Sequence, residues 1–560
     1  MTDEGPTGSE TADNAIDDPY VLSGPQSHEF WAASVVERIL ERAPDDPIVI
    51  KGGISPSGVP HLGNMNEIAR GYFVAEALRD RNRTVRQVFT ADDRDPLRRL
   101  PRTLADLDGN TVGLGDVDAG ALGRNLGKPY TAIPDPFGCC DSYGAHFSAL
   151  IERSADRLEI PVETVSNTEL YESGAFEDVT RYLLEHREQA RDVLANYQDT
   201  VGDDYVPFRP ICGDCGHVTE TNSVRSVDLD AGTVTYVCTD VEVGDRTIEG
   251  CSHEGVATLR EGKLPWRFEW PAQWHVLGVD FEPFGKDHAE GSWPSGVDIS
   301  RNVLGDVPPV PMTYEWFTLD GRPFSSSDGH VVTVGEVVEF LEPEVLRYFF
   351  TKDPSRARDF SVERIDQLVN EFDEFERTYF EEVGSDRRTT REASVAYPAV
   401  VDAVSEQPIR LPYTFAAVLG MTDDADLREA MARREGHIPA EASERSIEAA
   451  LERVEYARQW AERTDNAYNY RLEADLPSVA FDSDTEEALD ELASVVEREA
   501  DGETIQSAIF ETARDHGLSP GELFTAGYRL FFGTEQGPKL GPFLAELDRA
   551  FVVRRLRREA

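Results

Sequence analysis

The sequence contains no run of 18 apolar residues, and its first twenty residues are acidic and polar instead of basic and apolar. A membrane-spanning helix needs about 20 apolar residues, and a secretory signal needs a basic segment followed by an apolar one. We therefore expect a soluble cytoplasmic protein with no membrane partner. Because residues 1–20 show no apolar periodicity, we expect them to form a disordered acidic tail.

Basic residues are also scarce. The 560 residues include 106 Asp and Glu against 55 Lys and Arg, only six of which are lysine, and the net charge is −51. The carboxylates are spread along the whole chain, which is typical of a surface adapted to concentrated intracellular salt, where the Debye length falls to about 3 Å near 1 M. The alternative is an acidic binding protein. Nucleic acid is not excluded as a partner, since high salt already weakens the counterion release on which basic patches depend.

Cysteine is rare, and four of the six cysteines fall within residues 205–258. Their spacing begins with a Cys-x2-Cys pair and suits the four thiolates of a closed, structural zinc site, for which reduced and buried cysteines are the alternative. His217 and His253 are possible substitute ligands. The predicted zinc ligands are Cys212, Cys215, Cys238 and Cys251.

The other two cysteines, Cys139 and Cys140, are adjacent. Neighbouring cysteines cannot form an ordinary disulfide, so we expect this pair to be reduced and mostly packed. We expect the nearby His146 to be a structural hydrogen-bond partner, with catalysis as the less favoured reading.

The most informative stretch is Lys51–Asn64, KGGISPSGVPHLGN. The apolar run Ile48–Ile50 predicts a buried parallel strand, and an amphipathic helix is predicted from Leu62 to Leu78 after a turn rich in Gly, Ser and Pro. A strand, a glycine-bearing turn and a helix N-terminus together form a corner that binds anions. His61 and Asn64 could donate hydrogen bonds to phosphate oxygens there, although a tight turn with a helix-start histidine is the simpler alternative.

Polar residues follow two further predicted strands. Asp92–Asp95 come after the strand Thr84–Phe89, at the end where open α/β sheets bind ligands, and helix capping is their alternative role. Gly285–His288, GKDH, follow Val279–Pro283. Four tryptophans between 266 and 293 suggest a pocket wall or an aromatic core. The hydroxyl-rich segment 321–329, GRPFSSSDG, is either a phosphate-binding loop or a linker.

Taken in order, these segments resemble the archaeal-type class I lysyl-tRNA synthetases, from about residue 25 to the C-terminus. PSGVPHLGN resembles the family's form of the class I ATP-binding signature, and FSSSDG resembles its second signature, the loop that closes on ATP phosphates. DDRDPLRRLP, DPFGCCDSYGAHF, LGVDFEPFGKDH and GPKLGPFLAELDRAF resemble further blocks of that family. The second signature normally carries lysines on both sides of the serines, where this chain has Pro323 and Asp328, so Arg322 is the nearest replacement cation.

The resemblance implies an α/β Rossmann-type parallel-sheet catalytic domain with an inserted zinc-binding module, followed by an α-helical C-terminal half. Long Glu/Arg/Ala/Leu stretches after residue 360 also favour the helical half. The expected divisions are a tail (1–20), a catalytic domain in two parts (21–204 and 259–310), the zinc module (205–258), a signature-loop and stem-contact region (311–385) and an anticodon-binding domain (386–560).

The resemblance further implies a ligase that activates L-lysine with ATP and Mg²⁺ and transfers it to tRNA(Lys). The implied catalytic residues are His61, Gly63, Asn64, Arg322, Ser325, Ser326 and Ser327. ATP would also contact Pro56, Ser57, Gly58, Gly285, Asp287 and His288. The lysine ammonium needs a carboxylate or an aromatic wall, for which Asp93, Asp95 and Trp274 are the candidates.

Two alternatives remain at this point. One is a related class I ligase for another amino acid, with glutamate the nearest, although the carboxylates at 92–95 speak against an acidic substrate. The other is a non-catalytic paralogue that binds tRNA or a partner, which Pro323 and Asp328 would explain.

Overall fold

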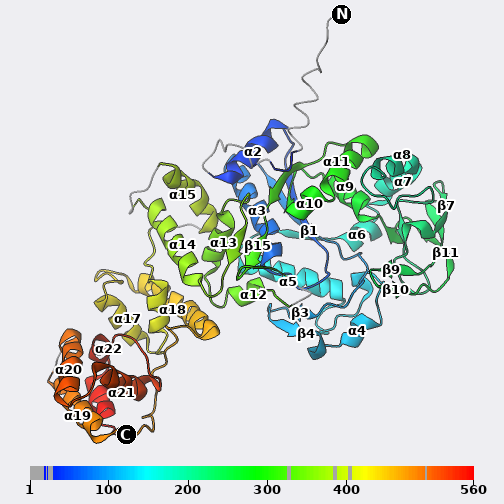
Figure 1. The fold of residues 1–560 in the computed structure, drawn as a ribbon. Helices are drawn as coiled ribbons and strands as arrows, with labels where there is room; N and C mark the ends of the chain where they lie inside the picture. The colour runs from blue at the N-terminus through cyan, green and yellow to red at the C-terminus, as the bar shows by residue number, and fades with distance from the viewer. Residues whose placement is uncertain are drawn as a thin grey trace, which may run out of the picture. The chain divides into compact units, whose positions relative to one another are not determined.

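The computed structural model describes residues 18–20, 22, 30–324, 329–381, 387–401, 406–498 and 501–559. Most of the predicted acidic tail and Ser325, Ser326, Ser327 and Asp328 lie outside the described residues. The chain divides into two compact units, coloured along the sequence in Figure 1. Unit 1 contains residues 1–337, 346–361 and 384–403, and unit 2 contains residues 338–345, 362–383 and 404–560.

Unit 1 is built on a five-stranded sheet in the order β14-β13-β1-β2-β5, and every pairing in it is parallel. The predicted strand at Ile48–Ile50 is its centre, and its apolar side chains are buried between helices on both faces, as parallel sheets require. The predicted parallel sheet is confirmed. The strands are β1 (Ile48–Ile54), β2 (Val85–Ala91), β5 (Glu163–Ser166), β13 (Phe281–Gly285) and β14 (Val310–Tyr314).

The register aligns the carboxyl ends of the central strands. Gly53 of β1 pairs with Thr90 of β2, and Gly285 of β13 pairs with Tyr314 of β14. The segments that follow these strands therefore meet at one rim of the sheet. The helices of unit 1 are α2 (Trp31–Glu41), α3 (Leu62–Arg79), α4 (Ala119–Gly123), α5 (Tyr143–Arg157), α6 (Asn167–Glu172), α7 (Glu177–Glu185), α8 (Arg187–Leu194), α9 (Trp266–Leu277), α10 (Lys286–Glu290), α11 (Trp293–Ile299), α12 (Val334–Val337) and α15 (Arg387–Val400).

A buried ion pair joins the two central strands. Lys51 Nζ of β1 lies 2.8 Å from Glu282 Oε1 of β13, and both side chains are almost fully buried. The indole N–H groups of Trp270 and Trp274 donate to the same carboxylate. A buried charge is tolerated only when it is paired and hydrogen-bonded, so this arrangement places most of the tryptophan cluster in the core.

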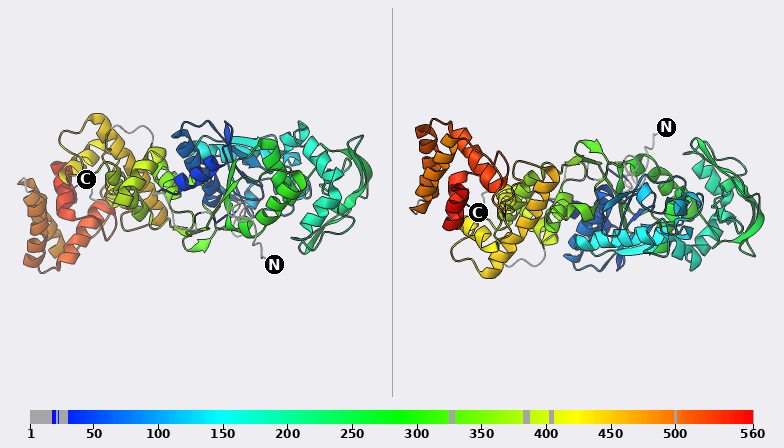
Figure 2. Two further views of the ribbon diagram at one scale, coloured as in Figure 1. Left: turned by 90° about the horizontal axis from the view of Figure 1, so that it is seen from above. Right: turned by 90° about the horizontal axis from the view of Figure 1, so that it is seen from below.

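Between β5 and β13 the chain leaves the sheet and forms α6–α8, the inserted module and α9. The module's strands lie at one end of unit 1 in both views of Figure 2. Its small core contains Phe208, Val234 and Tyr236, and its first and last strands pair with each other. The strands are β6 (Arg209–Pro210), β7 (Val224–Asp228), β8 (Thr233–Val237), β9 (Val241–Val243), β10 (Arg246–Ile248), β11 (Glu254–Thr258) and β12 (Gly262–Lys263).

Short strands flank the second signature. β15 (Phe317–Leu319) pairs antiparallel with β16 (Arg322–Pro323) and parallel with β17 (Arg358–Phe360). A further hairpin joins β3 (Thr103–Ala105) and β4 (Thr111–Gly113).

Unit 2 is helical, which confirms the predicted character of the C-terminal half. A buried Arg453 binds both Glu342 and Asp373 at its centre. The helix α15 belongs to unit 1, where the Val400 carbonyl accepts from Arg347 Nε at 2.7 Å, and the expected division at 386 stays a prediction. The helices are α14 (Ile365–Tyr379), α16 (Tyr413–Leu419), α17 (Ala425–Arg434), α18 (Glu444–Thr464), α19 (Ser483–Glu497), α20 (Gly502–Asp515), α21 (Pro520–Phe532), α22 (Leu540–Glu546) and α23 (Arg549–Leu556), while α13 (Pro343–Thr351) spans the division.

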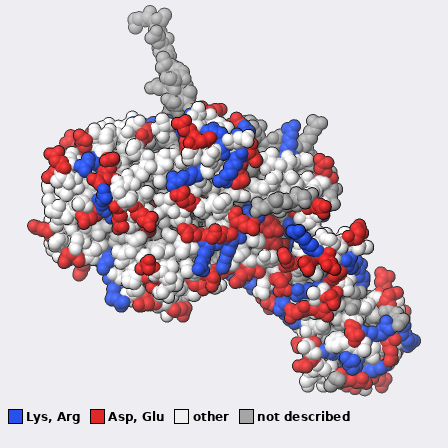
Figure 3. All heavy atoms as spheres, turned by 180° about the vertical axis from the view of Figure 1, so that it is seen from behind, with Lys and Arg blue, Asp and Glu red and all other residues white. Residues whose placement is uncertain are grey.

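Two surface observations bear on the composition. On the face drawn in Figure 3, carboxylates are spread widely and do not gather in one patch. Within the described ranges, no helix combines the length and the apolar character needed to cross a membrane.

Candidate active site

The tip of α3 is closed by a reciprocal pair of hydrogen bonds. His61 Nδ1 accepts from Gly63 N–H at 3.1 Å, and Asn64 Oδ1 accepts from His61 N–H at 3.0 Å. Because Nδ1 is the acceptor, the neutral ring carries its proton on Nε2. Burial lowers the pKa of His61 to about 4, so the ring is neutral at physiological pH and offers one N–H group to a ligand.

The two signature segments meet at this tip. The ring of Phe324 stacks on the ring of His61, with centroids 4.8 Å apart and planes 14° apart. On the other side of the serines, the Val332 carbonyl accepts from Leu62 N–H at 2.9 Å. The chain on both sides of 325–328 is therefore anchored to the start of α3. Arg322 is exposed, and its Nη2 lies 3.0 Å from His330 Nδ1.

A carboxyl group that the sequence interpretation missed lies beside this tip. Glu67 of α3 accepts from Gly53 N–H at 2.7 Å and from the Tyr314 hydroxyl at 3.1 Å. Burial, and then repulsion from Glu282, raise the pKa of Glu67 to about 8. Among the described residues it has no ion-pair partner. In the sequence it looks like one more charge on an amphipathic helix, so only the β1 and β14 contacts reveal it.

The third part of the rim comes from β13 and α10. Gly285 is the last residue of β13. His288 is half-buried, and the centroid of its ring lies 5.9 Å from the ring centroid of Trp266. Its Nδ1 lies 3.1 Å from Ser292 Oγ. Asp287 is exposed. The structure thus brings the predicted ATP residues of 56–64 and 285–288 to neighbouring strand ends.

Two of the three predicted lysine-binding residues have internal hydrogen-bond partners, and the third lines a cavity. Asp93 accepts from Ser166 Oγ at 2.6 Å and from Thr168 N–H at 2.8 Å, so it fixes the start of α6. Trp274 donates to Glu282 in the core. Both side chains thus have internal partners, because the segments that carry them pack against the sheet. Asp95 lines a cavity and pairs with Lys263, which also binds Glu269 at 2.7 Å.

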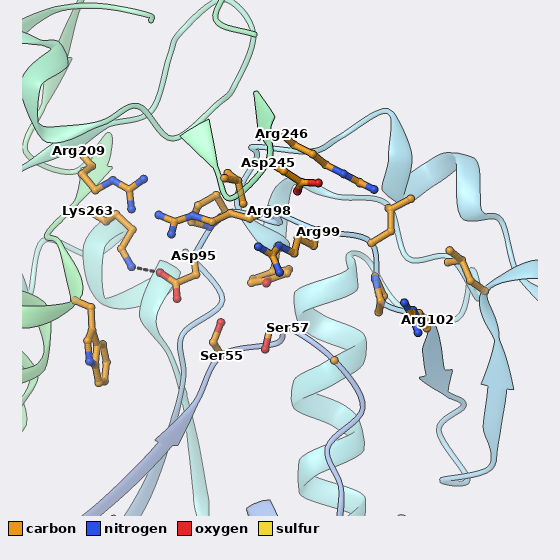
Figure 4. Close-up of a pocket in the computed structure, with 18 residues that line it drawn as sticks. Ser55, Ser57, Asp95, Arg98, Arg99, Arg102, Arg209, Asp245, Arg246 and Lys263 are labelled. Carbon is orange, nitrogen blue, oxygen red and sulfur yellow. Dashed lines mark hydrogen bonds and ion pairs between the residues drawn. The ribbon is translucent and has the colours of Figure 1, made fainter. Parts of the chain in front are cut away.

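That cavity has a volume of about 900 Å³ and opens beside the first signature (Figure 4). Its walls come from the first signature turn, the chain after β2, the ends of the module and the β9–β10 hairpin. They consist of Ser55, Ser57, Gly58, Asp95, Pro96, Arg98, Arg99, Leu100, Pro101, Arg102, Leu114, Tyr130, Arg209, Val243, Asp245, Arg246, Lys263 and Trp266.

The four cysteines predicted to bind zinc come together in the module. The Sγ atoms of Cys212, Cys215, Cys238 and Cys251 all lie within 4.8 Å of one another. Two of these distances are 3.6 Å, from Cys212 to Cys251, and 3.7 Å, from Cys215 to Cys238. Four converging sulfur donors suit a tetrahedral ion, so this set could bind zinc.

A second set of possible ligands was not recognised from the sequence. Asp135, Cys139, Cys140 and His146 also offer ligand atoms within 4.8 Å of one another. His146 Nε2 lies 2.9 Å from the Ala105 carbonyl, which leaves Nδ1 facing Cys139 Sγ at 3.3 Å. This set could hold a metal ion as well. His146 therefore lies among possible metal ligands, in addition to forming the predicted structural hydrogen bond.

Comparisons with known proteins agree with these features. A family model described as "tRNA synthetases class I (K)" matches residues 29–399. The chain is 66% identical to a lysine–tRNA ligase of Halobacterium salinarum and 65% identical to one of Haloarcula marismortui, covering 97% of this chain and 99% of the relative in both cases. It is 32% identical to a lysine–tRNA ligase of Pyrococcus horikoshii over 94% of this chain and 99% of that protein.

Proposed function

The chain belongs to the class I (K) tRNA synthetases, and from that premise we propose how its site carries out the lysine–tRNA ligase reaction. The carboxylate of lysine attacks the α-phosphorus of ATP, which gives lysyl-adenylate and pyrophosphate. The 2′-hydroxyl of the terminal adenosine of tRNA(Lys) then attacks the adenylate carbonyl, and AMP leaves. We propose that this takes place in the cytoplasm, where charged tRNA is used.

Neither step needs a protein nucleophile, so the site contributes positioning and charge stabilisation. His61 Nε2–H donates to phosphate oxygens, and the positive end of the α3 dipole stabilises their charge, while Ser57 and Gly58 border them. Gly285, Asp287 and His288 border the nucleoside from the neighbouring strand end. Ser325, Ser326 and Ser327, with Arg322, are proposed to cover the pyrophosphate, and ATP is expected to bind with Mg²⁺.

One observation carries this proposal: both flanks of the second signature contact the tip of α3, through the Phe324–His61 stack and the Leu62–Val332 hydrogen bond. Phe324 and Val332 therefore both border the helix tip at which the phosphates are proposed to bind.

Lysine-dependent ATP–pyrophosphate exchange in molar KCl tests the activity. We expect exchange with lysine and none with glutamate, despite Pro323 and Asp328. Exchange with glutamate alone would favour the related ligase, and no exchange by a protein that still binds tRNA would favour the non-catalytic alternative.

The lysine ammonium has two candidate partners, Glu67 and the predicted Asp95. We favour Glu67, because its carboxyl forms no ion pair among the described residues and the nearby Lys51 is paired with Glu282, whereas Asp95 is already paired with Lys263. The raised pKa of Glu67 is the expected property of a buried carboxyl that a cationic substrate would stabilise in its ionised form.

Glu67→Gln is therefore expected to raise KM for lysine roughly 10- to 100-fold, because it removes a charge-assisted contact, and to leave KM for ATP nearly unchanged. In the native enzyme, kcat/KM for lysine should rise with pH up to about 8, where Glu67 loses its proton. Glu76→Gln, on the same helix, is the control. If Asp95→Asn raised the lysine KM and Glu67→Gln did not, the ammonium would belong at Asp95.

The four-thiolate set of the module is proposed to hold one structural Zn²⁺. Four protein ligands leave no open position, so the ion would stabilise the module and take no part in the chemistry.

A further inference from the structure

The hairpin before the second signature holds the backbone of Arg322 in a fixed position. β15 and β16 are joined by Asp320 and Gly321, whose φ angles are both positive, at 48° and 76°. Two positive φ angles in a two-residue turn are typical of type I′, which matches the twist of the flanking strands and favours Asp-Gly. Asp320 N–H donates to the Phe360 carbonyl at 3.1 Å, and Gly321 N–H donates to Asp359 Oδ1 at 2.6 Å. The turn that precedes Arg322 is therefore tied to β17.

The side chain of Arg322 is held by a histidine. Its Nη2 lies 3.0 Å from His330 Nδ1, and His330 Nε2 lies 2.8 Å from the Leu319 carbonyl oxygen. A guanidinium can only donate, so Nδ1 is the acceptor. A carbonyl can only accept, so Nε2 carries the proton and the ring is neutral. Because Leu319 also pairs with Arg322 across the hairpin, the imidazole connects the guanidinium back to its own hairpin.

The absence of charge on this acceptor decides what Arg322 can do. A carboxylate partner neutralises an arginine, as Asp353 does for the exposed Arg356 at 3.4 Å. A neutral imidazole orients the guanidinium and leaves its positive charge intact. Within the described ranges no carboxylate forms an ion pair with Arg322, although the chain contains 106 Asp and Glu. Arg322 is also exposed, so its charge is accessible to an anionic ligand.

Both members of this pair stand beside the contacts that place the second signature at the nucleotide corner. Arg322 comes two residues before Phe324, whose ring stacks on that of His61. His330 comes two residues before Val332, whose carbonyl accepts from Leu62 N–H. The oriented cation therefore lies on the segment that borders the tip of α3.

We propose that His330 is a positioning residue, which holds the guanidinium of Arg322 for the β- and γ-phosphates of ATP and keeps its charge unneutralised. This rests on the proposed function, because it concerns the ATP that the same site would bind. His330 does not contact ATP in this proposal and acts only through Arg322. Ordering a long side chain on binding costs free energy, so a guanidinium that is already held binds a phosphate more tightly than a free one.

Calorimetric titration with ATP and Mg²⁺ in molar KCl, without lysine, tests the proposal. We expect Arg322→Gln to weaken ATP binding about tenfold, because it removes a charge-assisted contact. His330→Phe keeps a flat ring, removes the acceptor and should weaken binding roughly three- to fivefold. Because His330 acts through Arg322, adding His330→Phe to Arg322→Gln should change the affinity by less than about twofold. Additive losses in the double variant, or native affinity in His330→Phe, would overturn the proposal.

Titration with AMP separates positioning from a general structural role. AMP lacks the β- and γ-phosphates, so its affinity should be the same in the native protein and in every variant. An equal loss of affinity for ATP and AMP in His330→Phe would show that the ring shapes the whole site, which would refute the assignment.

Two further variants provide the controls. His330→Gln, whose amide can accept from Arg322 and donate to the Leu319 carbonyl, should bind ATP more tightly than His330→Phe. Arg356→Gln, which breaks the exposed pair with Asp353, should bind ATP as the native protein does. These titrations need no catalysis. Absence of lysine-dependent exchange in a native protein that binds ATP would therefore count against the proposed function and leave the assignment of His330 standing.

Discussion

His61→Asn is expected to lower kcat for lysine-dependent ATP–pyrophosphate exchange by about 10²- to 10³-fold, the usual effect of removing one donor that stabilises transition-state charge. Asparagine can still accept the Gly63 N–H bond that His61 Nδ1 accepts, and it is a good N-cap residue. It cannot reach the position of Nε2. The substitution therefore removes the donor and keeps the helix start, so the melting temperature should stay nearly unchanged.

Two comparisons make this result specific. His61→Ala should lose the same activity and also about 1 kcal/mol of stability, because the cap is lost. His275→Ala, an exposed histidine paired with Asp306, should lose neither. Full activity in the His61→Asn variant would show that the ring contributes only to the fold.

The pH dependence gives a further check on His61. Its pKa of about 4 lies below the ordinary value, so the ring stays neutral and donates through Nε2 between pH 5 and 8. We therefore expect that titration of His61 causes no change of kcat with a midpoint near pH 6.5. If the native enzyme showed such a midpoint and the His61→Asn variant did not, the ring would act as an acid or base.

The second large effect is expected in the module. Cys238→Ser should remove one zinc ion per chain, measured by elemental analysis as the difference from the native protein, since Asp135, Cys139, Cys140 and His146 could hold another ion. Structural zinc sites contribute on the order of 10 kcal/mol to folding. The module's core is small, so we expect residues 209–263 to become sensitive to proteolysis and aminoacylation to be lost.

The two nearby histidines provide the controls. His217→Ala and His253→Ala should keep the zinc, because the group in the module that could hold an ion, among the described residues, consists of the four cysteines. Loss of zinc in one of these variants, with retention in Cys238→Ser, would place that histidine among the ligands.

Much of the site followed from local pattern. The strand, the turn and the first turn of the helix follow one another directly in the sequence. The corner at Lys51–Asn64 could therefore be predicted without knowing the fold. The Cys-x2-Cys pair likewise predicted where the other thiolates would gather. The family resemblance placed the second signature near the first, and the contacts of Phe324 and Val332 agree with that placement.

The remaining features depend on contacts that no local pattern contains. Glu67 becomes a rim carboxyl only because Gly53 and Tyr314 lie beside it. Trp274 looked like a pocket wall, yet the buried Lys51–Glu282 pair needs its indole N–H as a donor. Arg99 and Arg246 stand far apart in a sequence dominated by carboxylates, and only the fold places both on one cavity.

The closing strands of the module have a consequence for how this protein could be altered. β6 and β12 run antiparallel, with Arg209 opposite Lys263 and Pro210 opposite Gly262, so the chain departs and returns at one point. A short turn could bridge that point and leave the register of the sheet intact, which makes the segment between these strands an exchangeable cassette. Swapping it would replace Arg246 of the cavity lining and spare Arg209 and Lys263.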